Sequence, residues 1–244
     1  MATIYLFDVD GTLTPPRQPM DEDFIEEFLG WMRDGEKSVC LVTGSDIEKV
    51  KEQVPEDILR ACKGIFTCMA NQYWVRNKLV YQVSFLPGRK LLTDLELYLE
   101  QESKYQPRTG NHIEVRPGMI NFSVVGSDAT QKQRKAYNQW DKYRKEREDI
   151  VEYVTQSYPH LEASIGGSVS VDIYPIGNDK SQAIKYLYTE EPDTNFIFVG
   201  DRTEPGGNDH ALVAELEEHE DSMWFKVEDW KDTQQLIREN EAFV

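Results

Sequence analysis

The sequence is poor in cysteine and has no long hydrophobic run. Its three cysteines, Cys40, Cys62 and Cys68, are an odd number without metal-ligand spacing, so we expect neither a disulfide framework nor a zinc site. No apolar run approaches the roughly 18 residues that a membrane span needs. The N-terminus also has neither the basic region nor the apolar stretch of a signal peptide. These absences favour a cytoplasmic protein in a reducing environment.

Positive charge is also scarce. The chain has 27 lysines and arginines against 44 aspartates and glutamates, which gives a net charge of −17. Such a surface repels phosphate backbones and anionic lipids, so we expect no nucleic acid and no membrane as a partner. An acidic enzyme can still act on small phosphates if it has a local basic pocket and a metal ion.

Short apolar runs alternate with helical patterns near the two ends of the chain. Residues 3–7, 38–42 and 195–199 are apolar and β-rich, and each run ends in a polar loop. Residues 21–33 have apolar side chains near helical period. Hydrophobic residues make up 39% of the 244, enough for a sizeable core. The pattern predicts an α/β fold with a Rossmann-like parallel sheet and helices on both faces.

The middle of the chain has a different pattern, in which partly alternating strands are separated by helices. The strand-like stretches are residues 80–86, 113–125 and 164–174, and the helical stretches are residues 89–103 and 130–158. We interpret the charged residues 141–149 as the solvated face of a helix. The pattern predicts a catalytic core at residues 1–79 and 179–244, with an inserted α+β cap at residues 80–178.

The segment DVDGTLT places two carboxylates directly after the first predicted strand. If the strand continues through Asp8 and Asp10, these residues point the same way, at the edge where open α/β sheets bind ligands. One carboxylate can attack phosphorus, the other can handle a proton, and a divalent cation can offset their repulsion. A plain acidic turn is the alternative, but the full string is more specific than two nearby aspartates.

Two further polar segments follow the same logic. Thr43, Ser45 and Asp46 lie between a strand and a helix, where hydroxyls and backbone N–H groups bind phosphate. An ordinary N-cap by Ser45 or Asp46 is the alternative. Lys180 begins a helical stretch and could neutralise a phosphoryl group and its nucleophile. A surface role is the commoner one for a single lysine.

The segment GDRTEPGGND follows the last apolar strand. Hard oxygen ligands at a strand end suit Mg²⁺, with Asp201 as the direct ligand. Asn208 and Asp209 could orient it or hold a metal-bound water. The alternative is a solvated glycine-rich loop.

The four polar segments, at Asp8, Thr43, Lys180 and Asp201, resemble in their order along the chain the haloacid dehalogenase-like (HAD) superfamily of aspartyl phosphotransferases. At a finer grain, DVDGTLTPPRQ, RPGMIN, SIGGSVSVD and PGGNDH together resemble the α-phosphomannomutase family. The resemblance runs from residue 4 to about residue 210. It implies a HAD core with a C2-type cap and the interconversion of mannose 6-phosphate and mannose 1-phosphate, in GDP-mannose biosynthesis.

The resemblance also implies roles for individual residues. Asp8 would carry the phosphoryl group, Asp10 would be the general acid and base, and Lys180 would complete the catalytic set. Asp8, Asp10 (through its carbonyl) and Asp201 would hold Mg²⁺. The implied substrate-binding residues are Arg17, Thr43, Ser45, Arg116, Arg134, Ser170 and Asp172. A hexose 1,6-bisphosphate would act as activator, and two chains would form a homodimer through their caps.

The residues of the cap support this interpretation in part. Arg116 in an alternating strand puts a fork-shaped cation on an open sheet face, as a phosphate requires, although a solvated arginine is the alternative. The family commonly has another arginine at the position of Ser127, for which Lys132 or Arg108 could substitute.

Ser127, together with Thr43 in place of a smaller residue, favours a second hypothesis, a Mg²⁺-dependent sugar-phosphate phosphatase in which water resolves the aspartyl phosphate. A non-catalytic binding protein would have lost a catalytic carboxylate, whereas Asp8, Asp10 and Asp201 are all present.

Overall fold

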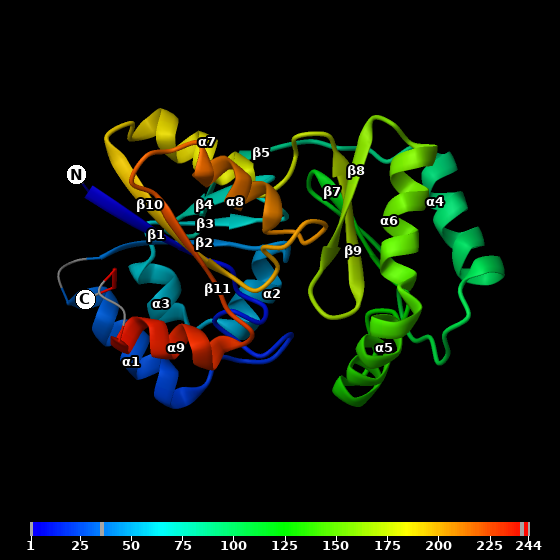
Figure 1. Cartoon of the computed structure of the whole chain (residues 1–244), viewed down its shortest axis with the longest axis horizontal. Coiled ribbons are helices and arrows are strands. Elements are labelled where there is room, and N and C mark those ends of the chain that lie inside the picture. The colour runs from blue at the N-terminus through cyan, green and yellow to red at the C-terminus, as the bar shows by residue number, and fades with distance from the viewer. Residues whose placement is uncertain (1, 35–36, 240–241, 244) are drawn as a thin grey trace.

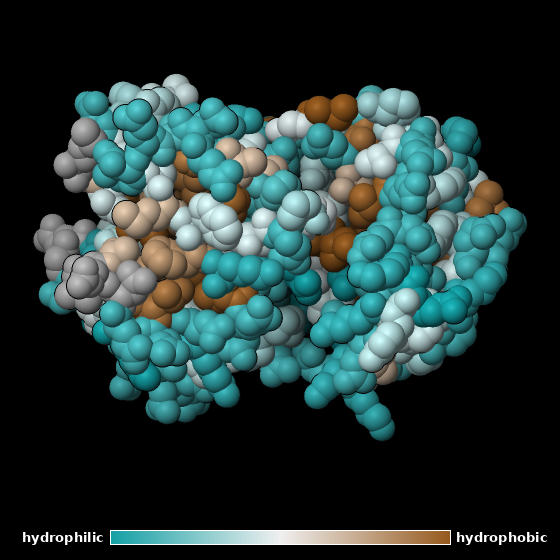
Figure 2. Space-filling view, in the orientation of Figure 1, coloured by the Kyte–Doolittle hydropathy of each residue, from teal (hydrophilic) through white to brown (hydrophobic). Residues whose placement is uncertain are grey.

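The computed structural model describes residues 2–34, 37–239 and 242–243 and contains two β-sheets, each with its own helices. We call the part around the larger sheet the core and the part around the smaller sheet the cap. Figure 1 shows the core on the left and the cap on the right, joined near the top of the view. The face seen in Figure 2 is mostly hydrophilic, as expected for a chain with 29% charged residues.

Within the described residues, the core sheet has seven strands. The first five in spatial order pair in parallel, and the last two are joined by antiparallel pairing. In that order they are β11 (Met223–Lys226), β10 (Thr194–Gly200), β1 (Ala2–Phe7), β2 (Ser38–Val42), β3 (Gly64–Thr67), β4 (Gln72–Val75) and β5 (Lys78–Gln82).

Helices cover both faces of the core sheet. Alternate side chains of β1 point to opposite faces, and both sets are buried against these helices. Tyr5 and Phe7 pack on the face of α1 (Glu22–Arg33), α2 (Ile47–Gln53), α3 (Glu56–Ala61) and α9 (Trp230–Glu239). Ile4 and Leu6 pack on the face of α7 (Ser181–Glu190) and α8 (His210–Glu217). The predicted parallel sheet with helices on both faces is confirmed.

The cap sheet is antiparallel, with the order β6 (Ile113–Arg116), β7 (Met119–Ser123), β9 (Ser170–Pro175) and β8 (Leu161–Gly166). One face packs on α4 (Arg89–Leu97), the short π-helix η1 (Tyr98–Glu102), α5 (Gln131–Arg144) and α6 (Glu146–Ser157). Along β7, Ile120 and Phe122 face these helices, so Asn121 and Ser123 lie on the face toward the core. The cap therefore presents a polar sheet face to the core.

Several predicted elements differ from the structure. The stretch at residues 80–86 is not a cap strand, because β5 pairs with β4 in the core sheet, so the predicted boundary at residue 80 falls inside a core strand. The stretch at residues 164–174 is a hairpin that turns at Gly167 (φ 47°). The stretch at residues 130–158 is two helices, because Lys145 adopts the left-handed conformation (φ 60°).

The prediction that the charged residues 141–149 are a solvated helix face holds only in part, because residues 142–145, 148 and 149 are exposed whereas Asp141, Glu146 and Arg147 are buried. They span the break between α5 and α6, where Asp141 and Arg147 are buried and Arg147 Nε lies 2.7 Å from Asp141 Oδ2. Arg147 also donates from its backbone N–H to Asp141 Oδ1 (3.0 Å). The ion pair therefore fixes the angle between the two helices.

Asn71 contacts both segments that join the core to the cap. Its backbone oxygen accepts from Val83 N (2.8 Å), and its Nδ2 donates to Asn178 O (3.1 Å). A Cβ at Gly118, in the turn of the β6–β7 hairpin, would collide with the Asn71 side chain. Asn71 is fully buried and sets where the cap attaches.

Among the described residues, no helix is both long and apolar enough to cross a bilayer.

Replacing Arg147 with methionine should lower the free energy of unfolding by about 3 kcal/mol or more, because it leaves Asp141 buried and unpaired. Urea denaturation measures this change. The matched control is Glu148→Gln, which breaks the exposed Lys145–Glu148 pair on the same helix turn and should change stability little. Equal effects of the two variants would contradict a structural role for the buried pair.

Candidate active site

The polar loops after β1, β2 and β10 meet at the carboxyl edge of the core sheet, where the cap sheet covers them. One cavity lies between them. It is lined by every predicted site residue except Lys180, namely Asp8, Asp10, Arg17, Thr43, Ser45, Arg116, Arg134, Ser170, Asp172 and Asp201. Core and cap therefore contribute to one site.

Lys180 lies beneath the cavity and not on the surface. It is fully buried, and its Nζ lies 2.6 Å from Asp8 Oδ1 and 2.6 Å from Asp209 Oδ1. Burial alone would lower the pKa of Lys180, but Asp209 and Asp8 outweigh it and raise the pKa. Lys180 is therefore a permanent cation that fixes one oxygen of each carboxylate.

The three carboxylates of Asp8, Asp201 and Asp209 form a cluster whose ligand atoms lie within 4.8 Å of one another. Gly11 (φ 95°) makes this approach possible, because a Cβ there would lie 2.8 Å from Asp201 Oδ2. Both oxygens of Asp209 are already engaged, by Lys180 and by the backbone N–H of Arg202 (3.0 Å). Asp8 and Asp201 are therefore the carboxylates best placed to hold a divalent cation, and Asp209 orients Lys180.

The cluster carries more negative charge than Lys180 offsets. Burial raises the pKa of Asp8 to about 7, although Lys180 acts in the opposite direction. Burial, followed by the charge of Asp8, raises the pKa of Asp201 well above its usual range. A Mg²⁺ ion would relieve this repulsion, and the donors are the hard oxygens that it prefers.

The carboxylate of Asp10 is turned away from this cluster. It accepts from Arg17 N (2.7 Å) and Gln53 Nε2 (2.9 Å) on Oδ1, and from Ser45 Oγ (3.1 Å) on Oδ2. The three donors hold this carboxylate in a fixed orientation at the cavity wall. Gln53 was not predicted, because a glutamine in the last turn of α2 has no sequence signal for this contact.

The loop at Thr43 and Ser45 is held by a strained turn after β3. Cys68 and Met69 both have left-handed backbones (φ 54° and 60°). Their N–H groups donate to Ser45 O (2.9 Å) and Thr43 O (3.0 Å). Asp46 is the N-cap of α2, accepting from Lys49 N (2.9 Å), so the capping alternative holds for Asp46, while the Ser45 hydroxyl faces Asp10.

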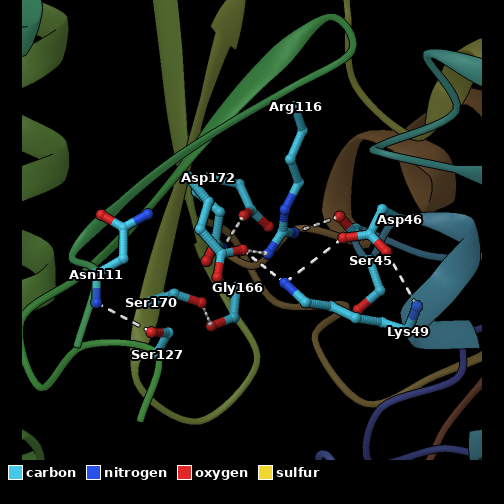
Figure 3. A network of polar contacts seen from close by, with 12 residues as sticks. Ser45, Asp46, Lys49, Asn111, Arg116, Ser127, Gly166, Ser170 and Asp172 are labelled. Atoms are coloured by element: carbon cyan, nitrogen blue, oxygen red, sulfur yellow. Dashed lines mark hydrogen bonds and ion pairs between the residues drawn. The ribbon is translucent and has the colours of Figure 1, made fainter. Parts of the chain in front are cut away.

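Arg116 is buried at the boundary between cap and core (Figure 3), so the alternative of a solvated arginine is wrong. Its Nη1 donates to Gly44 O of the core (2.8 Å), and its Nη2 donates to Glu114 of the cap. Glu114 was not predicted, but its position two residues before Arg116 on a strand places both side chains on one face, which is a usable signal.

Asp172 lies at the centre of the cap wall and is buried. Its Oδ1 accepts from Asn121 Nδ2 (2.7 Å) on the neighbouring strand, and its Oδ2 accepts from Asn208 Nδ2 (3.4 Å) in the core. Gly44 passes close to it, because a Cβ there would lie 3.1 Å from Asp172 Oδ2. Asp172 is therefore fixed in place while its carboxylate can accept a further hydrogen bond from a ligand.

Arg134 completes the cap wall beside Ser127. Its Nη2 donates to Ser127 O (2.9 Å) and its Nε donates to Ala129 O (3.0 Å). Arg108 does not replace the missing arginine, because its guanidinium donates to the carbonyls of Leu99, Ser103 and Tyr105. In a chain of net charge −17, the cavity thus gathers three arginines, Arg17, Arg116 and Arg134, a local group of cations beside its carboxylates that suits an anionic ligand.

Ser170 lies at the rim of the same cap wall (Figure 3). Its Oγ donates to Gly166 O (3.0 Å), across the turn of the β8–β9 hairpin. A hydroxyl held in this way can still accept a hydrogen bond from a ligand hydroxyl.

Comparisons with known proteins agree with one another. Residues 25–242 match the family model described as eukaryotic phosphomannomutase. A phosphomannomutase from Spinacia oleracea is 34% identical over 225 residues, which cover 87% of this chain and 87% of that protein. A probable phosphomannomutase from Caenorhabditis elegans is 33% identical over 247 residues, covering 96% and 94%. A solved structure, a HAD subclass IIB sugar phosphatase, has a TM-score of 0.58 at 14% identity and covers 100% of each chain, so the two share a fold.

Replacing Asp201 with asparagine should weaken Mg²⁺ binding at least about tenfold, because the cluster loses a charged oxygen ligand. The rise of the unfolding temperature with Mg²⁺ concentration measures the affinity. Asp221→Asn, at an exposed position outside the cavity, is the control and should behave as the wild type. A wild-type Mg²⁺ dependence of Asp201→Asn would show that Asp201 is not a ligand.

Proposed function

The chain belongs to the eukaryotic phosphomannomutase family, and we propose that it interconverts mannose 6-phosphate and mannose 1-phosphate through an aspartyl phosphate. One observation carries the proposal. A single cavity places the carboxylates of Asp8 and Asp10 opposite the cap arginines Arg116 and Arg134. The first pair suits phosphoryl transfer, and the second suits a phosphate at the other end of the same sugar.

Asp8 is the nucleophile in this proposal. Its Oδ1 is held by Lys180, which leaves Oδ2 to attack phosphorus. A hexose 1,6-bisphosphate primes the enzyme, since a new bond forms between Asp8 and phosphorus and the bond from phosphorus to the sugar oxygen breaks. Asp10 gives its proton to the departing sugar oxygen.

The second half-reaction runs in the opposite direction on mannose 1-phosphate. Asp10 takes the proton of the 6-hydroxyl, whose oxygen attacks phosphorus, and the bond to Asp8 breaks. The product is mannose 1,6-bisphosphate, which turns in the cavity and returns its 1-phosphate to Asp8. Mannose 6-phosphate then leaves, and the atoms balance over the cycle.

Electrostatic stabilisation comes from both sides of the cavity. Mg²⁺ held by Asp8, Asp201 and the carbonyl of Asp10 would supply positive charge to the transferring phosphoryl group. Lys180 keeps Asp8 oriented, and Thr43 offers its hydroxyl to the phosphate oxygens, while the Ser45 hydroxyl donates to Asp10 Oδ2 (3.1 Å) at the same edge of the cavity. On the cap, Arg116 and Arg134 bind the distal phosphate, with Arg17 beside them on the core.

Specific recognition of the sugar is assigned to Asp172 and Ser170. Both line the cavity and can accept hydrogen bonds from sugar hydroxyls. Arg116 and Arg134 then recognise only the charge of the phosphate.

The proposal extends to the assembly and the location of the chain. The inserted cap spans residues 83–178, since β5 ends at Gln82. The enzyme acts in the cytoplasm, in GDP-mannose biosynthesis, as a homodimer joined through its caps. The edge strand β6, with Val115 52% exposed, offers a surface for that contact.

A second candidate function is a sugar-phosphate phosphatase with the same machinery. Ser127 favours it, because a serine at this point of the cavity wall offers no charge to a distal phosphate. The family match and the identities of 33–34% to phosphomannomutases support the mutase.

Replacing Asp8 with asparagine should lower turnover at least about a thousandfold, because the variant has no nucleophile. The enzyme is incubated with Mg²⁺, mannose 1-phosphate and glucose 1,6-bisphosphate, and mannose 6-phosphate and inorganic phosphate are both measured. Asp57→Asn, on the exposed side of α3, serves as control. Steady release of inorganic phosphate by the wild type without mannose 6-phosphate would contradict the mutase proposal.

Replacing Ser127 with arginine should lower the concentration of glucose 1,6-bisphosphate needed for half-maximal activity about tenfold. The reason is a new charge-assisted contact to the distal phosphate. Ser127→Ala is the control and should leave this concentration unchanged. An unchanged requirement in Ser127→Arg would show that this part of the wall does not meet the phosphate.

A further inference from the structure

An ion pair crosses from core to cap at the cavity. Lys49 Nζ on α2 lies 2.5 Å from Glu114 Oε2 on β6. Among the residues that the structure describes, this is the one ion pair that joins the two parts, which are 65 residues apart in the chain at this point. Figure 3 shows Lys49 directed from the core helix toward the cap sheet.

The two side chains of the pair are mostly buried, and each has a second charged neighbour. The side chains of Lys49 and Glu114 are 20% and 22% exposed. Lys49 is also 3.5 Å from Asp46, the N-cap of its own helix. Burial would raise the pKa of Glu114, but Arg116 and Lys49 together lower it to about 2, so the carboxylate stays charged.

Glu114 links the ion pair to the phosphate site. It accepts from both Lys49 and Arg116, while Arg116 donates across the boundary to Gly44 O (2.8 Å). Gly44 lies in the core loop between Thr43 and Ser45. One carboxylate therefore ties the cap arginine and the core helix to the loop that meets the transferring phosphoryl group.

In the part of the chain that the structure describes, the other contacts between cap and core do not pair two full charges. Ile165 N donates to Gly206 O (2.8 Å), and Gln131 Nε2 donates to Pro16 O (3.0 Å). Arg202 Nη2 donates to the neutral carbonyl of Gly167 (3.0 Å). The Lys49–Glu114 pair is thus the contact whose strength depends most on ionic strength.

We propose that Lys49 and Glu114 form a clasp that holds the cap closed over the core while the sugar bisphosphate turns. The proposal rests on the proposed mutase function. Each opening of the cap gives water access to the aspartyl phosphate and lets the bisphosphate escape. Lys49 is then a positioning residue, which acts through the closed cap and not on the reacting atoms.

The test compares Lys49→Met with Lys51→Met. Lys51 lies on the same helix but, among the described residues, forms its one ion pair with Glu48 of that helix (2.9 Å), and its side chain is 42% exposed. The ratio of open to closed molecules should rise about fivefold in Lys49→Met, the upper range for a pair of this kind, and should not change in Lys51→Met. Small-angle X-ray scattering without substrate would show this as a larger radius of gyration.

The second measurement is the fate of the phosphoryl group. With Mg²⁺, mannose 1-phosphate and glucose 1,6-bisphosphate, the ratio of inorganic phosphate to mannose 6-phosphate should also rise about fivefold in Lys49→Met. In the wild type this ratio should rise as NaCl increases from low concentration, whereas Lys49→Met should respond weakly. A residue that merely stabilises the fold would not change the salt dependence of this ratio.

The Glu114→Gln variant distinguishes an effect on cap closure from an effect on the phosphate site. It should open the cap as Lys49→Met does and should also raise KM, because Arg116 loses its charged partner. The double variant should open no further than Glu114→Gln alone, since Glu114→Gln already removes the Lys49–Glu114 pair.

Two results would overturn the clasp. One is a scattering profile of Lys49→Met equal to that of Lys51→Met, and the other is an unchanged ratio of phosphate to mannose 6-phosphate in a variant that folds normally. Failure of the clasp and failure of the proposed function give different results. A wild type that makes no mannose 6-phosphate contradicts the mutase, whereas the scattering measurement tests the clasp independently of that result.

Discussion

A fully buried lysine ammonium held between two carboxylates is the interaction on which the site depends. Lys180 Nζ is 2.6 Å from both Asp8 and Asp209, and the lysine and Asp209 have no exposed surface. Removing one member of a buried group like this leaves an uncompensated charge, at a cost of about 3–5 kcal/mol. The three residues come from the end of β1, the start of α7 and the start of α8. One electrostatic requirement therefore orients Asp8, the proposed nucleophile, and fixes the point where the chain returns from the cap.

The core was predictable because its strands are short, apolar and buried on both faces. In β1, Tyr5 and Phe7 face one helical layer while Ile4 and Leu6 face the other, so the run is continuously apolar and reads as a parallel strand. The carboxyl ends of parallel strands meet at one edge, and this rule alone brings Asp8, Ser45 and Asp201 into one cavity. The resemblance of the cap segments to one family supplied the rest of the predicted site.

The errors lie where side chains meet across long stretches of sequence or where one residue changes the backbone. Lys145 gave no sign that it would take a left-handed conformation, so two helices were predicted as one. Asp141 and Arg147 look like surface charges in the sequence, and only the hairpin of α5 and α6 buries them against each other. Gln53 reaches Asp10 from 43 residues away, a contact that no local pattern encodes. Hydrophobic periodicity predicts which face of a helix or strand is buried. These contacts depend instead on how the helices and strands pack against one another.

The division of charge between core and cap would make cap closure and phosphate binding one event in the proposed mutase. The core side of the cavity holds the carboxylate cluster, and its net negative charge repels a sugar phosphate until cations join it. Two of those cations, Arg116 and Arg134, belong to the cap, and Arg116 reaches the core loop only when the cap lies against it. A mutase intermediate must present either of its phosphates to the same distal site, so the contacts there must recognise charge and not the position of the phosphate on the sugar. Guanidinium groups satisfy that requirement, and the requirement is what separates this cavity from one that needs to bind a single phosphate and release it to water.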